Sequence, residues 1–215
     1  KIPYEKSNDA WIADLTIEMI EQRPKDKPFF SVCSMIGSHP PFKIPEPYFS
    51  MYDEEEVPEP SNFHLTDGKP KCKGKSFYHK LWEDHGTEWS AWKKSVTTYW
   101  GFVTHIDDQV GRLVQCLNDE GDYEDTLIIF CSDHGEMPGQ HGLWHKMQAY
   151  EESLRVPLVF SAPWIKCDKR STTLTSLIDL APTILGTTGC SIPDSYEDED
   201  LSVVLTDQSD RTARS

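Results

Sequence analysis

The sequence predicts an α/β fold with a largely parallel central sheet and helices on both faces. The first observation is a set of short apolar runs, typical of buried strands, at residues 29–36, 127–131 and 156–160. The second is that helical segments alternate with these runs, an order that favours right-handed crossovers and parallel pairing. A chain of 215 residues with 37% hydrophobic residues can also bury a substantial core.

Four segments are expected to be helical, at residues 9–23, 88–117, 147–154 and 175–188. The first has Asn8 or Asp9 available as an N-cap. In the second, which is the longest, apolar residues lie on or near one face, and Gly121 is a plausible stop signal. The last is expected to kink or restart at Pro182, because proline cannot donate a helical hydrogen bond.

Composition argues against several classes of function. A net charge of −15 argues against nucleic-acid binding, which needs a basic face. No run approaches the roughly 18 apolar residues that span a bilayer, so no membrane span is expected. The six cysteines form no CxxC pair and no zinc-ribbon spacing. Cys33 and Cys131 lie inside apolar runs, where a cysteine most often acts as a small buried hydrophobe.

Polar residues follow two of the predicted strands directly. Asp133 and His134 come after the run 127–131, and His39 comes shortly after the run 29–36. Because the carboxyl ends of parallel strands meet at one edge of a sheet, where binding sites form, these residues are expected to lie close together. The convergence of acid and imidazole at two strand ends is the first indication of a functional site.

The residue types at this edge suit metal and anion chemistry. Asp133 can offer a hard carboxylate oxygen to a divalent cation, and His134 can add an imidazole nitrogen. Two prolines after His39 fix the backbone there. Lys146, in a loop rich in glycine and histidine, can offer an ammonium group to an anionic substrate. Each residue also has a purely structural alternative: a turn-capping aspartate, a packed histidine or a solvated lysine.

Two stretches carry a resemblance to a known family. They are "KPFFSVCSMIGSHPPF" (27–42) and "SDHGEMPGQHGLWHK" (132–146), within a match that spans most of the chain. The sequence resembles the sulfatase family of the alkaline-phosphatase superfamily. That resemblance implies an α/β sandwich with a largely parallel sheet and a metal-dependent enzyme that hydrolyses a sulfate ester. It also favours a periplasmic or extracellular location.

The resemblance also implies roles for individual residues. Asp133 and His134 match two ligands of a divalent metal site, most often calcium. Lys146 matches a catalytic lysine that grips the sulfate group, and His39 matches a histidine that contacts the sulfate or the leaving-group oxygen. His141 lies where some members place a substrate-facing residue. The implied partner is a sulfate-ester small molecule or glycan.

One family motif is missing from the sequence. Sulfatases use a formylglycine made from a Cys-x-Pro-Ser-Arg stretch, and no such stretch occurs here, nor does the amino-terminal Asp-Asp ligand pair. The chain is therefore expected to be the later part of a sulfatase catalytic domain, with formylglycine upstream, and to be inactive alone. Residues 37–87 are expected to form a substrate-side insertion loop, and residues 88–190 the core that binds metal and sulfate.

Two alternatives are open at this point. A phosphoester or phosphonate monoester hydrolase of the same superfamily would place zinc or manganese at the site, metals that His134 suits better than calcium. A non-catalytic sulfatase-like remnant would keep the fold without the nucleophile. The acidic segment 45–90 would repel polyanions, which favours a small or sparsely sulfated ester.

Overall fold

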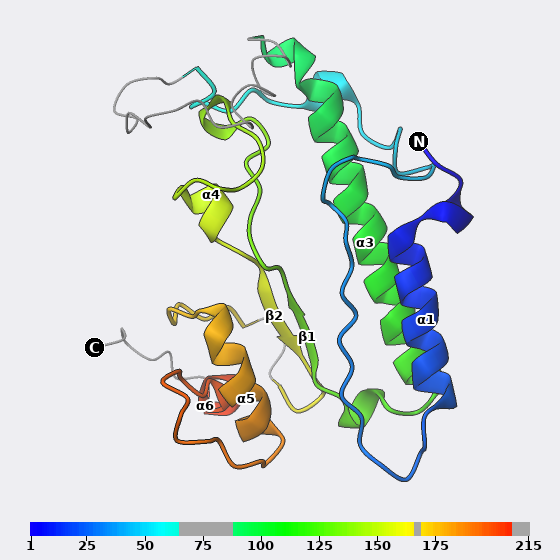
Figure 1. Cartoon of the computed structure of the whole chain (residues 1–215), viewed down its shortest axis with the longest axis vertical. Helices are drawn as coiled ribbons and strands as arrows, with labels where there is room; N and C mark the ends of the chain where they lie inside the picture. The colour runs from blue at the N-terminus through cyan, green and yellow to red at the C-terminus, as the bar shows by residue number, and fades with distance from the viewer. Residues whose placement is uncertain (65–87, 166–168, 208–215) are drawn as a thin grey trace. The chain divides into compact units, whose positions relative to one another are not determined.

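The computed structural model describes residues 1–64, 88–165 and 169–207. The chain forms two compact units (Figure 1). The first contains Lys1–Asp122 and His134–Arg155, and the second contains Tyr123–Asp133 and Val156–Ser215. Across the described ranges, no helix combines the length and apolarity that a membrane crossing requires.

Two helices, α1 (Asn8–Gln22) and α3 (Lys93–Asp119), run side by side in the first unit (Figure 1). The N-cap of α1 is Ser7, whose Oγ accepts a hydrogen bond from the Ala10 N–H at 3.4 Å. The predicted caps, Asn8 and Asp9, are therefore wrong, because both residues already lie inside the helix. Gly121 follows the end of α3 with φ +75°, and so the predicted stop signal is confirmed.

The buried faces of these helices are more polar than the predicted apolar stripes. On α1 the buried positions include Ala10, Ala13 and Thr16, whereas Trp11 and Met19 are 60% and 68% exposed. Small side chains permit the close approach of α3 along this face. On α3, the buried set includes three polar side chains, Thr97, His105 and Gln109.

Residues 29–36 do not form the predicted strand. Phe30 and Val32 are 75% and 73% exposed, and in the described part of the chain the only strands that pair are β1 and β2. Apolar composition indicated a strand here, but a strand also needs a partner with which to share backbone hydrogen bonds. The backbone N–H groups of Ile36 and Gly37 donate instead to a side chain, that of Asp9.

The second unit contains β1 (Ile128–Cys131) and β2 (Leu158–Ser161). The two predicted strands are confirmed, each beginning one or two residues later than expected. They pair antiparallel, with Ile128 opposite Ser161 and Cys131 opposite Leu158, so the expected parallel pairing does not hold between them. Cys131 is exposed and Cys33 half-buried, which corrects the expectation that both are buried.

Shorter helices complete both units. In the first unit, α4 (Glu151–Leu154) forms only the last turn of the predicted helix 147–154. In the second, a 3₁₀ turn leads into α5 (Leu180–Thr187), so that the helix restarts before Pro182 and places this proline in its first turn. The last described element is α6 (Ser202–Asp207).

Candidate functional site

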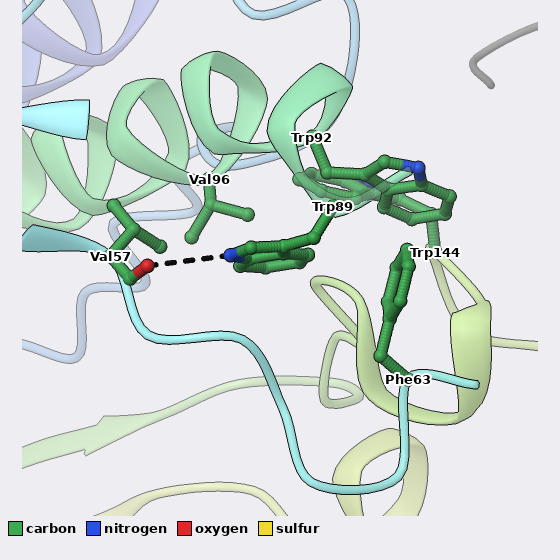
Figure 2. Packing of buried hydrophobic residues seen from close by; sticks show 6 residues of the cluster. All are labelled: Val57, Phe63, Trp89, Trp92, Val96 and Trp144. Carbon is green, nitrogen blue, oxygen red and sulfur yellow. Dashed lines mark hydrogen bonds between the residues drawn. The ribbon is translucent and has the colours of Figure 1, made fainter. Parts of the chain in front are cut away.

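An aromatic cluster anchors the loop that carries most of the candidate residues. Figure 2 shows its members, which come from distant parts of the sequence: Val57, Phe63, Trp89, Trp92, Val96 and Trp144. Trp144 is only 4% exposed, and its ring centroid lies 5.8 Å from that of Trp92. The loop passes so close to the cluster that a Cβ on Gly139 would lie 2.5 Å from the Trp89 ring. Burial of Trp144 therefore fixes the loop two residues before Lys146.

Backbone hydrogen bonds fold the same loop back on itself. The Met137 N–H donates to the His145 carbonyl at 3.1 Å, and the Gly139 N–H donates to the Leu143 carbonyl at 3.0 Å. Near its start, the Gly135 N–H donates to the Ser153 carbonyl at 2.8 Å. These bonds bring the beginning of the loop, after His134, beside its end at His145.

His39 joins this loop from a segment about a hundred residues earlier in the chain. Its ring stacks on that of His145, with centroids 6.4 Å apart and planes 29° from parallel. The pKa of His145 is lowered to about 4, first by burial and then by the charges of Lys146, His39 and His134. All four residues belong to the first unit and are close enough to interact electrostatically. The structure thus brings together three of the five predicted site residues, together with His145.

Two of these imidazoles have the same orienting contact. His39 Nδ1 lies 2.7 Å from the Pro40 carbonyl, and His134 Nδ1 lies 2.7 Å from the Gly135 carbonyl. Because a carbonyl can only accept, each Nδ1 must carry the proton, and in the neutral ring Nε2 is then the acceptor. This arrangement suits Nε2 for a metal ion or for a proton on a substrate.

Glu136 and Tyr99 lie near this group of histidines and Lys146. Burial raises the pKa of Glu136, while the Met137 N–H and then Lys146 act in the opposite direction. Burial also raises the pKa of Tyr99, and the negative charge of Glu136 adds to that rise. Sequence reasoning missed Glu136 and His145, although both stand inside the stretch "DHGEMPGQHGLWHK" that pointed to the site.

His141 has different neighbours from the other predicted residues. Its ring stacks on Tyr150 with centroids 3.9 Å apart, and its Nε2 lies 3.9 Å from Glu152 Oε2. Its backbone N–H donates to Asn62 Oδ1 at 3.1 Å. His141 is therefore held by Tyr150, Glu152 and Asn62, and its substrate-facing role stays a prediction.

Asp133 is the last residue of the first segment of the second unit, and the next residue, His134, begins a segment of the first unit. It is exposed, and the Ser132 hydroxyl approaches its Oδ1 at 3.5 Å. Among the described residues, no group of three or more His, Cys, Asp or Glu side chains could hold a metal ion. The predicted metal-binding role of Asp133 and His134 therefore stays a prediction.

A sequence model of the sulfatase family matches residues 2–190. The chain belongs to the sulfatase family. Among curated relatives, it is 33% identical to an arylsulfatase of Clostridium perfringens over 87% of this chain. It is 31% identical to a multifunctional alkaline phosphatase superfamily protein of Trinickia caryophylli over 94% of this chain. The match covers 39% and 42% of those two relatives, so this sulfatase-family chain spans less than half of their length.

A solved structure shows the same fold. The phosphonate monoester hydrolase of Silicibacter pomeroyi superposes on 99% of this sulfatase-family chain with a TM-score of 0.81 and 27% sequence identity, and the match covers 44% of that hydrolase. The fold of the chain is thus that of the alkaline-phosphatase superfamily, to which sulfatases belong.

Proposed function

We propose that this chain supplies the anion-contacting part of a sulfuric ester hydrolase. The observation that carries the proposal is the convergence of His39, His134 and Lys146 around the ring of His145. Membership of the sulfatase family supports a sulfate ester as the substrate. The grouping of one cation with oriented imidazoles suits a tetrahedral anion, because charged donors stabilise charge on a transferring group.

The proposal gives each residue a role. Lys146 donates hydrogen bonds from its ammonium group to a sulfate oxygen and helps to offset charge on the leaving group. His39, with Nδ1 bound to the Pro40 carbonyl, directs Nε2 towards the sulfate or the leaving-group oxygen. His141 contacts a more distant part of the substrate. His145 stays uncharged at neutral pH, because its pKa is about 4, and it supports the ring of His39.

Asp133 and His134 would hold a divalent metal ion. These two side chains are suitable metal ligands. Asp133 is an exposed carboxylate, and the Nδ1 contact of His134 leaves its Nε2 as the acceptor. A bound divalent ion would offset negative charge on the ester oxygens. Calcium is the family expectation, whereas the imidazole ligand suits manganese or zinc better.

No residue of this chain fits the role of the formylglycine nucleophile. Each cysteine lacks the Pro-Ser-Arg context, including Cys190, which is followed by Ser-Ile-Pro. We therefore assign no nucleophilic step to these residues.

We further propose the arrangement of the complete catalytic domain. Residues 37–64 would shape the substrate mouth, and residues 88–190 would carry the metal and sulfate contacts; the rest of the expected insertion loop, residues 65–87, lies outside the described residues. β1 and β2 would belong to a larger, mostly parallel sheet, which the likeness to the Silicibacter pomeroyi hydrolase supports. The acidic segment 45–90 favours a small or sparsely sulfated ester over a polyanionic glycan.

A phosphonate monoester hydrolase is the second candidate, and the 27% identity to such an enzyme over nearly the whole chain favours it. Rates of the full-length protein on para-nitrophenyl sulfate and on a para-nitrophenyl phosphonate monoester separate the two. We expect kcat/KM to be higher for the sulfate ester. A higher value for the phosphonate monoester would favour the second candidate. Turnover of neither substrate, with no binding of inorganic sulfate, would indicate a non-catalytic remnant.

A further inference from the structure

Asp9 is a buried carboxylate that holds the backbone just before His39. It lies in the first turn of α1, and its residue surface is only 2% exposed. Its Oδ1 accepts two hydrogen bonds, from the Ile36 N–H at 2.8 Å and from the Gly37 N–H at 2.9 Å. The Ile36 carbonyl in turn accepts the His39 N–H at 3.1 Å, which closes a turn. One carboxylate oxygen therefore fixes the start of the turn that ends at His39.

The other side of this turn packs against α3. A Cβ on Gly37 would lie 2.4 Å from the Phe102 ring and 2.8 Å from Asp9 Oδ2. The next residue, Ser38, interacts with Tyr99 of the same helix, an interaction that lowers the pKa of the Tyr99 hydroxyl. The turn is thus clamped between a carboxylate of α1 and aromatic side chains of α3, so it has little room to shift.

The ring of His39 depends on this clamp for its position. His39 is exposed; its ring contacts the Pro40 carbonyl of its own backbone and stacks on the ring of His145 with centroids 6.4 Å apart. The backbone turn, rather than dense packing around the ring, therefore sets where Nε2 lies. We propose that Asp9 is a positioning residue for His39, an inference that rests on the proposed role of His39 in the site.

Two substitutions separate the acceptor from the charge of Asp9. In the parent, Oδ1 of Asp9 accepts both backbone N–H groups. Asp9→Asn keeps an oxygen at this position and removes the negative charge. Asp9→Ala removes the acceptor and leaves two backbone N–H groups without this partner. If Asp9 positions His39 through Oδ1, the kcat that Asp9→Ala loses should be kept in Asp9→Asn.

The experiment uses the full-length protein and para-nitrophenyl sulfate. Asp9→Ala should lower kcat about tenfold or more, because small misplacements of a reacting group are costly. Asp9→Asn should stay within about threefold of the parent. In a His39→Ala background, Asp9→Ala should cause little further loss, because residues that act through one another are not additive. If Asp9→Ala does not fold, Tyr99→Phe, which removes the hydroxyl that interacts with Ser38, should lower kcat in the same His39-dependent way.

Amide hydrogen exchange at Ile36 and Gly37 and the NMR chemical shifts of the His39 ring provide readouts independent of activity. Asp9→Ala should speed exchange at both amides and change the ring chemical shifts, and Asp9→Asn should restore both. Equal losses of kcat with and without His39, or unchanged ring chemical shifts, would overturn the positioning role. Changed ring chemical shifts with unchanged turnover would instead uphold the positioning and contradict the catalytic part assigned to His39.

Discussion

Lys146 is half-buried, and its positive charge shifts the pKa values of two neighbouring side chains. It lowers the pKa of His145 and opposes the burial-driven rise in the pKa of Glu136. In the full-length protein, Lys146→Ala should lower kcat/KM at least tenfold, since losing one donor to a developing anion costs about 10²–10³ in rate. The melting temperature should change little, because a lysine in a loop buries little apolar area.

Lys6→Ala is the matched control for this measurement, since Lys6 is an exposed lysine of the same unit in a 3₁₀ turn before α1. Kinetics on a sulfate ester and thermal melts of both variants check the prediction. Full activity in the Lys146→Ala protein would contradict the role of this residue, whatever the control shows.

Individual site residues could be predicted from the sequence where they lie together in one short stretch. His134 and Lys146 lie in one short stretch whose residue types indicate anion and metal chemistry. The importance of Asp9 was not predictable, because its partners, Ile36 and Gly37, stand 27 and 28 residues away. An aspartate next to a helix start is typical of a cap, whereas the carboxylate of Asp9 holds another segment.

The contact between α1 and α3 contains a buried histidine. His105 is completely buried on α3, and its Nε2 lies 2.7 Å from Ser7 Oγ at the start of α1. Its other ring nitrogen faces the amide nitrogen of Gln109 at 3.4 Å, a donor. The contacts thus favour the neutral ring with its proton on Nε2. A second proton on Nδ1 would face the amide N–H of Gln109, which is a donor and not an acceptor.

This contact predicts a loss of stability in acid. Burial lowers the pKa of His105, and the positive charge of Arg112 lowers it further, against the opposing charges of Asp9 and Asp108. The unfolded ring titrates near its ordinary pKa of 6.5. Below that pH the unfolded state binds more protons than the folded state, so the free energy of unfolding falls. The contribution of His105 is therefore present above about pH 6.5 and is lost as the pH decreases towards the folded pKa.

Thermal melts between about pH 7 and pH 5 check this prediction, since most carboxylates stay ionised over that window. The melting temperature of the parent should fall on acidification, and His105→Gln should show a smaller fall. His145 contributes in the same direction because its pKa is also lowered. An equal pH dependence in His145→Gln and the parent would assign the effect to His105, whereas an equal dependence in His105→Gln and the parent would contradict the prediction.

Helix positions were predictable from the sequence, but the faces that they bury were not. Periodicity and Gly121 located α1 and α3 to within a few residues. The burial of His105 and Gln109 depends on partners at the start of the chain, namely Ser7 and Tyr4. A rule that assigns apolar residues to the core could not anticipate a polar network between two helices.

For the whole molecule, two of the three predicted strands were located correctly, but the parallel pairing expected for them was wrong. β1 and β2 form where apolar residues cluster, yet they pair antiparallel. Alternation of strands and helices predicts parallel pairing as a general tendency. It does not specify which strands become neighbours in a particular chain, and the apolar run 29–36 finds no strand partner among the residues described.

Metal binding by the isolated chain of 215 residues tests the proposed metal site of Asp133 and His134. Calcium usually takes 6–8 oxygen ligands, whereas the proposed site takes one carboxylate, that of Asp133, and one imidazole, that of His134. Calorimetry should therefore show calcium binding with a Kd of about 10⁻³ M or weaker. Manganese or zinc should bind more tightly than calcium, because imidazole nitrogen is a better ligand for them.

Substitution of the carboxylate separates this site from general binding to an acidic protein of net charge −15. Asp133→Ala should weaken manganese binding, because it removes one of only two proposed ligands. Asp125→Ala, which removes another exposed carboxylate of the second unit, should leave the affinity unchanged. Micromolar calcium binding, or manganese binding that both substitutions affect equally, would contradict the proposed ligand pair and point to diffuse attraction by the acidic surface.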